Sequence, residues 1–228
     1  NLYTLAVKIT AYPRLRGVSL PSQKDAKLSE ILESLMAVNQ PHRIAQVLGW
    51  TMAAFLKCHI FTFRNEFPLL SLHGEPGSGK TSTASVFAAL HGVDYRLEFT
   101  PLNLPATTAF PVWTFISQSN TVPRLLEEFN KSKMPRNYDV YTENFKACWN
   151  EHAVSRGTLA NVRLNGGSPS GAIIQEIKLS GPVVLCSEQE INTPSLVERT
   201  VQVRFSQKDK AVPEYICNFE YVCNNIDD

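Results

Sequence analysis

Hydrophobic positions in the first part of the chain recur at helical spacing. Over residues 22–62 they fall three and four apart, as they do along one face of an amphipathic helix. Asn39 and Pro41 interrupt the pattern, and proline is favoured in the first turn of a helix but not inside one. The spacing therefore predicts two successive helices. Their apolar positions are Leu28, Ile31, Leu32, Leu35 and Met36 in the first, and Ile44, Val47, Leu48, Phe55 and Leu56 in the second.

Beyond residue 66 the pattern changes to short apolar runs separated by helical stretches. Runs of strand character occupy residues 67–73, 93–99 and 182–186, and residues 200–205 alternate like a strand. Helical patterns fall within residues 82–90, 105–119 and 138–152. Because strands that alternate with helices pair in parallel, the chain is predicted to have an α/β fold. We expect the strand over residues 93–99 to lie beside the strand over residues 67–73.

A glycine-rich segment follows the apolar run over residues 67–73 and leads directly into a helical pattern. Its sequence, Gly-Glu-Pro-Gly-Ser-Gly-Lys-Thr, matches the P-loop pattern in the strand–loop–helix context that the motif requires. Glycines let backbone N–H groups turn inward around phosphate oxygens, and the helix N-terminus favours the same anion. Lys80 can reach the β- and γ-phosphates, and the Thr81 hydroxyl can ligate Mg²⁺. The sequence therefore predicts a site for ATP and Mg²⁺, formed by Gly74, Glu75, Pro76, Gly77, Ser78, Gly79, Lys80, Thr81 and Ser82.

Two adjacent carboxylates, Glu127 and Glu128, follow two leucines. A P-loop hydrolase needs an acidic residue at the end of a core strand to hold Mg²⁺, and a neighbouring carboxylate to polarise the attacking water. We assign the first role to Glu127, together with Thr81, and the second to Glu128. The preceding Pro123-Arg124 interrupts the strand pattern, so a solvated charge pair at the start of a helix stays open as an alternative.

The apolar run over residues 182–186 ends in Ser187 and Glu188, and one of these is expected to sense the γ-phosphate or the water. Arg199 ends a short helical segment that begins at Pro194, and we expect it to reach the nucleotide of a neighbouring subunit. A guanidinium there would neutralise charge that develops on the transferred phosphoryl group. The alternative is a surface arginine paired with Glu198 or Glu214.

Residues 158–180 have the pattern of a long hairpin, with apolar residues in both arms and a centre rich in glycine, serine and asparagine. Such a hairpin either projects into a central pore, where it contacts a phosphate backbone, or is an ordinary surface feature. On the first interpretation the nucleic-acid contacts come from Arg163, Ser168, Ser170 and Lys178.

Composition sets broad limits on the setting of these motifs. The chain has 228 residues and a net charge of +1, so nucleic-acid binding would depend on local patches rather than on a global field. Five scattered cysteines form no close-spaced pair, which favours a reducing, cytoplasmic setting, and Cys58 and Cys186 fall in apolar runs typical of buried thiols. No apolar run is long enough to cross a bilayer. Because the first residue is Asn, we expect a piece of a longer protein.

The order of these motifs resembles that of superfamily 3 helicases, within the AAA+ class, and most of all the helicase part of phage and poxvirus-type primase–helicases. The resemblance covers roughly residues 67–205 and is strongest at the P-loop. It implies a Walker B pair, a pore hairpin, a sensor strand and an arginine finger at Glu127-Glu128, residues 158–180, Gly181–Glu188 and Leu196–Arg199, respectively. Two features depart from the family pattern: Ser187-Glu188 replaces the usual sensor Asn, and the hairpin tip lacks the usual Lys or His.

Together the motifs and the resemblance predict an α/β P-loop ATPase with a small N-terminal helical domain. The expected division is residues 1–21 as a linker or edge strand, 22–63 as a helical collar, 64–206 as the ATPase core and 207–228 as a lid or tail. The expected function is that of a hexameric replicative DNA helicase, moving along single-stranded DNA in the cytoplasm of a host cell, with a fused or associated primase or polymerase domain. A protein-remodelling ATPase and a non-hydrolysing assembly module remain alternatives, and helices that simply pack on the core remain the alternative to a collar.

Overall fold

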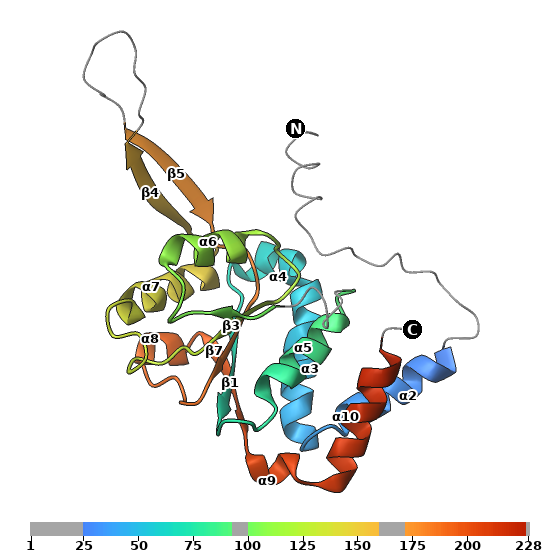
Figure 1. The fold of residues 1–228 in the computed structure, drawn as a ribbon. Helices are drawn as coiled ribbons and strands as arrows, with labels where there is room; N and C mark the ends of the chain where they lie inside the picture. Colours follow the sequence, from blue (N-terminus) through green and yellow to red (C-terminus); the bar gives the residue numbers. More distant parts are fainter. Residues whose placement is uncertain (1–24, 93–99, 160–171, 227–228) are drawn as a thin grey trace.

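The computed structural model describes residues 25–92, 100–159 and 172–226, and its helices cover both faces of a central sheet (Figure 1). The sheet contains β1 (Leu69–Gly74), β2 (Leu102–Asn103), β3 (Arg124–Glu127), β6 (Val183–Ser187) and β7 (Thr200–Phe205). The helices are α2 (Asp25–Met36), α3 (Pro41–Phe55), α4 (Lys57–Arg64), α5 (Lys80–Ala89), α6 (Ala109–Ser117), α7 (Tyr138–Trp149), α8 (Pro194–Val197), α9 (Gln207–Lys210) and α10 (Pro213–Asn225).

The sheet is entirely parallel in its described part, with the strand order β2-β3-β6-β1-β7. This confirms the predicted α/β fold. It also places β6 between β1 and β3, so the carboxyl ends of all three strands meet at one edge. Both sides of β1 are occupied, by β6 and β7, so the expectation that residues 93–99 pair with β1 is wrong. Those residues themselves lie outside the described part.

Alternate side chains along β1 pack into two different hydrophobic cores. Leu70 and Leu72 contact a core built with α2, α3, α5 and α10, whereas Leu69 contacts a core built with α6, α7 and α8. A sheet covered on both faces needs strands that are apolar throughout, which explains the continuous runs in the sequence. Helix α3 shares its core with the sheet, so the N-terminal helices pack directly on the sheet.

The second predicted N-terminal helix is two helices in the structure. Helix α3 ends before Leu56, and α4 continues after a bend of 83°. No single helix in the described ranges is long and apolar enough to cross a membrane, although this bent pair passes a test of length and composition alone. Cys58 is exposed on α4, so the expectation of a buried thiol is wrong there, whereas Cys186 is buried in β6. The short helix α4 turns most of its side chains outward.

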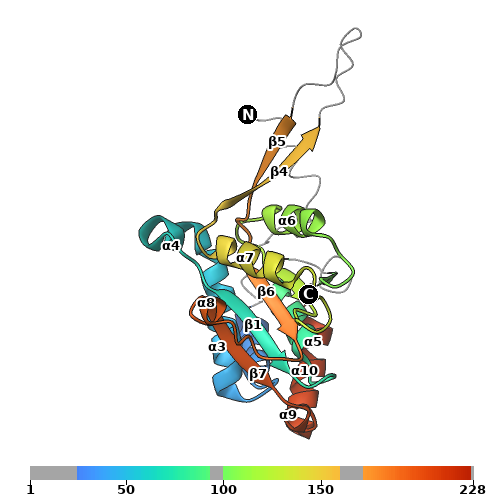
Figure 2. The ribbon, with the colours of Figure 1, turned by 90° about the vertical axis from the view of Figure 1, so that its left-hand side faces the viewer.

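The predicted hairpin is present, but it begins earlier than the sequence pattern suggested. Strand β4 (Ala153–Leu159) pairs antiparallel with β5 (Ala172–Lys178), and the two strands project from the body of the molecule (Figures 1 and 2). Arg163, Ser168 and Ser170 lie outside the described residues.

Residues 207–226 return across the N-terminal helices. Helix α10 packs against α2, and the Tyr221 hydroxyl donates a hydrogen bond to Glu30 Oε2 at 2.9 Å. The beginning and the end of the described chain therefore lie side by side (Figure 1).

Candidate nucleotide-binding site

The loop after β1 has the backbone that its glycines predict. Gly74, Gly77 and Gly79 all have positive φ angles, of 141°, 71° and 90°. A Cβ atom at Gly74 would lie 1.9 Å from the carbonyl oxygen of Phe205 on the neighbouring strand, so no other residue fits there. The loop therefore leaves the sheet tightly beside β7 and enters α5 at Lys80.

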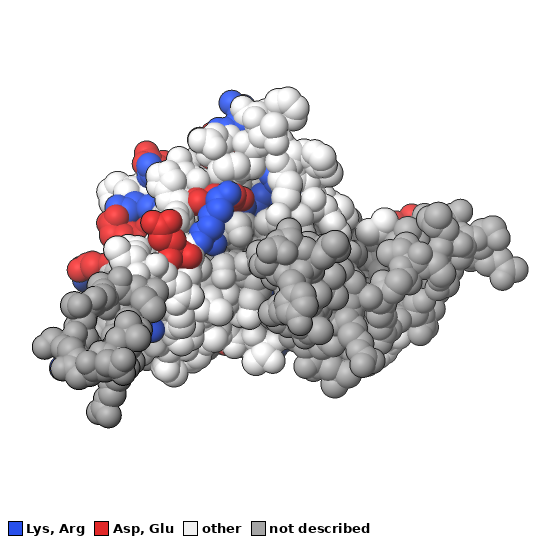
Figure 3. All heavy atoms as spheres, turned by 90° about the horizontal axis from the view of Figure 1, so that it is seen from above, with Lys and Arg blue, Asp and Glu red and all other residues white. Residues whose placement is uncertain are grey.

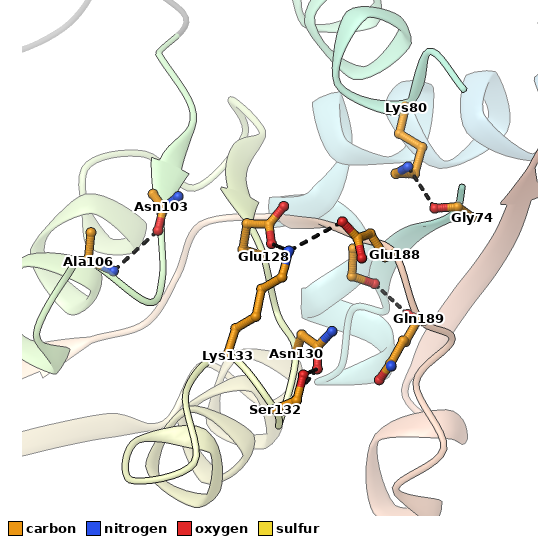
Figure 4. A network of polar contacts seen from close by, with 11 residues as sticks. Gly74, Lys80, Asn103, Ala106, Glu128, Asn130, Ser132, Lys133, Glu188 and Gln189 are labelled. Atoms are coloured by element: carbon orange, nitrogen blue, oxygen red, sulfur yellow. Dashed lines mark hydrogen bonds and ion pairs between the residues drawn. The ribbon is translucent and has the colours of Figure 1, made fainter. Parts of the chain in front are cut away.

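Lys80 closes this loop in the structure. Its ammonium donates hydrogen bonds to the carbonyl oxygens of Gly74 and Glu75, both at 2.8 Å, and lies 3.3 Å from Ser78 Oγ (Figure 4). Burial lowers the pKa of Lys80, although Cys186 and the nearby carboxylates oppose the shift. The ammonium therefore occupies the mouth of the loop, where phosphate oxygens would replace the two carbonyls as its partners.

Thr81 and Glu127 meet although they lie 46 residues apart in the sequence. The Thr81 hydroxyl donates a hydrogen bond of 2.6 Å to Glu127 Oε1, and Glu127 is the last residue of β3. A hydroxyl and a carboxylate are hard oxygen ligands of the kind Mg²⁺ prefers, and Mg²⁺ keeps several waters and takes further oxygens from phosphates. The pair thus fits the role that the sequence assigned to it.

Glu128 follows β3 and extends its pairing with β6, since its backbone N–H donates to the Cys186 carbonyl at 2.9 Å. Its φ angle of 66° is unusual for a residue other than glycine, and such backbone strain is common at functional sites. Lys133 forms an ion pair with its carboxylate and lies 3.2 Å from Glu188 Oε1 (Figure 4).

One cavity of about 200 Å³ brings these groups together at the carboxyl ends of β1, β3 and β6. Most of the residues that line this cavity were predicted from the sequence motifs to take part in catalysis or nucleotide binding. The lining residues are Pro76, Gly77, Lys80, Thr81, Glu127, Glu128, Cys186, Ser187 and Glu188.

The two candidate sensor residues differ in their contacts. Ser187 is buried at the end of β6, and its hydroxyl donates to the backbone carbonyl of Gln189. Glu188 is exposed and contacts Lys133. Both line the cavity, so the structure keeps Ser187 and Glu188 together as candidates.

Arg199 lies far from the loop of its own chain. It immediately precedes β7, and its carbonyl accepts a hydrogen bond from Leu69 N–H at the opposite end of β1 from Gly74. Its guanidinium pairs with Glu198 and donates to the Ser195 carbonyl at 2.5 Å. The pairing with Glu198 matches the alternative weighed for this residue, and the position separates Arg199 from the P-loop of its own chain.

A second, more apolar cavity of about 190 Å³ opens on the other side of the loop. Three parts of the chain enclose it: the loop at Ser78 and Gly79, the turn after α2, and one face of α10. Helix α9 also holds the loop, because Gln207 donates from its backbone N–H to Glu75 Oε2 at 3.0 Å and from Nε2 to the Pro76 carbonyl at 2.6 Å. Residues 207–228 were expected only to form a lid or tail, although the aromatic residues of α10 were an available signal for a contact with the loop. The cavity is lined by Val38, Asn39, Ser78, Gly79, Ser82, Thr83, Lys210, Tyr215, Ile216, Phe219 and Glu220.

Lys178 lies at the base of the hairpin, opposite Ala153. Its ammonium is 2.6 Å from a carboxylate oxygen of Glu151, which also pairs with the buried Lys57. On the face seen from the hairpin side, acidic and basic side chains of the described residues are interspersed, without a continuous patch of one sign (Figure 3).

No protein-family model matches the sequence, and no curated protein sequence matches it significantly. Among solved structures, one described as the active helicase Cch of SCCmec type IV matches with a TM-score of 0.51 and 12% identity, over 87% of this chain and 35% of that chain. A JCV helicase matches with a TM-score of 0.45 and 13% identity, over 99% of this chain and 58% of that one. NtrX from Brucella abortus, in complex with ATP, matches with a TM-score of 0.37 and 13% identity, over 89% and 42%.

This chain therefore spans about a third of the Cch helicase and just over half of the JCV helicase. At these identities the Cch likeness concerns the fold alone, and the two lower-scoring matches add nothing to it. The chain has an α/β P-loop fold of the kind found in a helicase.

Proposed function

We propose that this chain is the ATPase part of a ring-forming DNA helicase of the superfamily 3 type. The observation that supports this most is the convergence of Lys80, Thr81, Glu127 and Glu128 on one cavity at the carboxyl ends of adjacent strands. Lys80 and the loop amides bind the phosphates of ATP. The apolar cavity against α10 provides space for the base beside the same loop.

Thr81 and Glu127 hold Mg²⁺, which supplies positive charge against the β- and γ-phosphates. Glu128 accepts a hydrogen bond from the attacking water and so increases its nucleophilicity. Arg199, at the opposite end of the sheet, completes the site of a neighbouring subunit by stabilising charge on the transferred phosphoryl group. Hydrolysis thereby takes place between subunits.

The hairpin β4–β5 is the element that contacts DNA. It lies in the chain between α7 and β6, so β5 leads into the amino end of the strand whose carboxyl end lines the nucleotide cavity. The helices over residues 25–64 contribute to assembly of a hexameric ring. A replicative role and a primase or polymerase partner, as in the phage and poxvirus-type enzymes, belong to the same proposal.

The proposal is tested by the rate of ATP hydrolysis with and without single-stranded DNA, alongside mass by light scattering. We expect Mg²⁺-dependent turnover, stimulation by DNA and a mass several times that of the chain. Turnover without stimulation would favour a protein-remodelling ATPase. Assembly with nucleotide bound and no turnover would favour a non-hydrolysing module, and either result would overturn the helicase proposal.

A further inference from the structure

The turn after β3 places Lys133 beside the end of its own strand. Asn130 Oδ1 accepts hydrogen bonds from the backbone N–H and the hydroxyl of Ser132, at 2.9 and 2.8 Å. The Asn130 carbonyl accepts from the N–H groups of Lys133 and Met134, both at 3.1 Å. Phe129 and Met134 are buried at the two ends of the turn. Because the turn is fixed by these contacts, Lys133 has a defined position and is not a freely solvated side chain.

Lys133 joins the ends of two neighbouring strands. Its ammonium pairs with Glu128, which follows β3, and with Glu188, which follows β6 (Figure 4). Hydrogen bonds to Glu128 and then to Glu188 raise the pKa of Lys133, so it stays protonated. The three side chains are 33 to 40% exposed, and contacts between groups this exposed to water are weak enough to break and reform.

The contact with Glu128 matters for hydrolysis. A carboxylate that polarises water must accept a hydrogen bond from that water, so it needs an oxygen lone pair that is free to face the water. An ammonium bonded to the same carboxylate occupies an oxygen that the water would otherwise use, and it restrains the orientation of the side chain. The carboxylate therefore performs its task better without the bridge than with it.

We propose that Lys133 is a positioning residue that restrains Glu128 until its bridge between Glu128 and Glu188 opens, so that this opening limits the rate of hydrolysis. The inference rests on the proposed ATPase function and concerns the regulation of the same site. Lys133 itself does not line the cavity for the phosphates, whereas both of its partners do. Its removal is therefore expected to change turnover and to leave nucleotide affinity unchanged.

The test compares steady-state ATP turnover and equilibrium binding of a fluorescent ATP analogue in the wild-type chain and in Lys133→Met. We expect the variant to raise kcat about two- to fivefold, the factor that corresponds to an exposed ion pair, with the dissociation constant unchanged. Lys133→Arg keeps the bridge and should keep the wild-type kcat. Lys131→Met is the matched control, because Lys131 lies in the same turn with its ammonium 5.8 Å from the centre of the Tyr138 ring.

Urea unfolding shows whether each variant is folded. If Lys133→Met is not, Lys133→Gln takes its place in the comparison. If the wild-type chain turns over ATP and neither Lys133→Met nor Lys133→Gln raises kcat, the inference is overturned and the ATPase proposal stays intact. A fall in kcat would likewise overturn it, since Lys133 would then support catalysis. Absence of turnover in the wild-type chain and in both variants would overturn the ATPase function itself, and the restraint with it.

Discussion

His91 is buried just after α5, where its ring stacks on that of Phe55 with centroids 3.7 Å apart. Burial lowers the pKa of His91 to about 4, partly opposed by a hydrogen bond to the Thr51 backbone. In the unfolded chain the pKa is near its ordinary 6.5. The unfolded state therefore takes up a proton at a pH where the folded state does not, and stability falls as the pH drops through this window.

We predict that the wild-type chain loses on the order of 3 kcal/mol more stability between pH 7.5 and pH 4 than His91→Phe, which cannot protonate there. Urea unfolding of both proteins across this pH range measures the difference in stability. The contribution of the carboxylates cancels because they titrate in both proteins. Parallel stability curves for the two proteins would show that His91 does not titrate as its burial implies.

The P-loop and the acidic pair could be assigned from the sequence because their requirements are local. The chemistry of phosphate and Mg²⁺ directly requires each of their groups: a glycine that tolerates no Cβ atom, a lysine, a hydroxyl and two carboxylates. The restraint by Lys133 could not be assigned, because its partners lie 5 and 55 residues away. Its bridge exists only where the ends of β3 and β6 meet.

At the scale of elements, a buried charge network joins α4 to the base of the hairpin. Lys57 is 1% exposed, pairs with Glu151 and donates to the Ser180 carbonyl at 2.6 Å. Burial alone would raise the pKa of Glu151, yet its bonds to Lys178 and Lys57 hold that pKa below the ordinary value. Lys178 belongs to the same network but its side chain is 61% exposed. The network therefore contains one buried and one exposed contact to the same carboxylate.

We predict that Lys57→Met lowers the free energy of unfolding by about 3 kcal/mol, because it removes the buried partner of Glu151 and the donor to the Ser180 carbonyl. Lys178→Met, the matched change at the exposed end, should cost at most about 1 kcal/mol. Urea unfolding measures both. Equal losses in the two variants would contradict this account of the network.

Most of the longer helices and strands up to residue 205 could be predicted because each has its own period in the sequence, whereas α10 was not predicted. The break at Leu56 could not, since no glycine or proline marks it, and neither could the start of β4 at Ala153. That start depends on the pairing of Ala153 with Lys178, across the whole hairpin. The neighbours of β1 were predicted wrongly for the same reason, because strand order is set by packing between distant segments.

At the scale of the whole molecule, the sheet separates the two halves of the proposed catalytic site. The P-loop follows the carboxyl end of β1. Arg199 directly precedes the amino end of the parallel strand β7, so it lies at the opposite edge of the sheet. In the proposed assembly, one subunit therefore contributes the loop and its neighbour contributes the arginine. The sequence indicated this arrangement through the position of Arg199, but an interface between subunits is a property of the assembly and has no local pattern.

The most direct test of hydrolysis between subunits is the ATP turnover of an equal mixture of Lys80→Ala and Arg199→Ala chains. Each variant alone lacks one half of every site and should be inactive. After mixing and reassembly, some interfaces combine an intact Lys80 with an intact Arg199, and we predict a return to about a quarter of the wild-type rate. No recovery from two folded, assembled variants, or full activity of either variant alone, would contradict a site shared between neighbouring subunits.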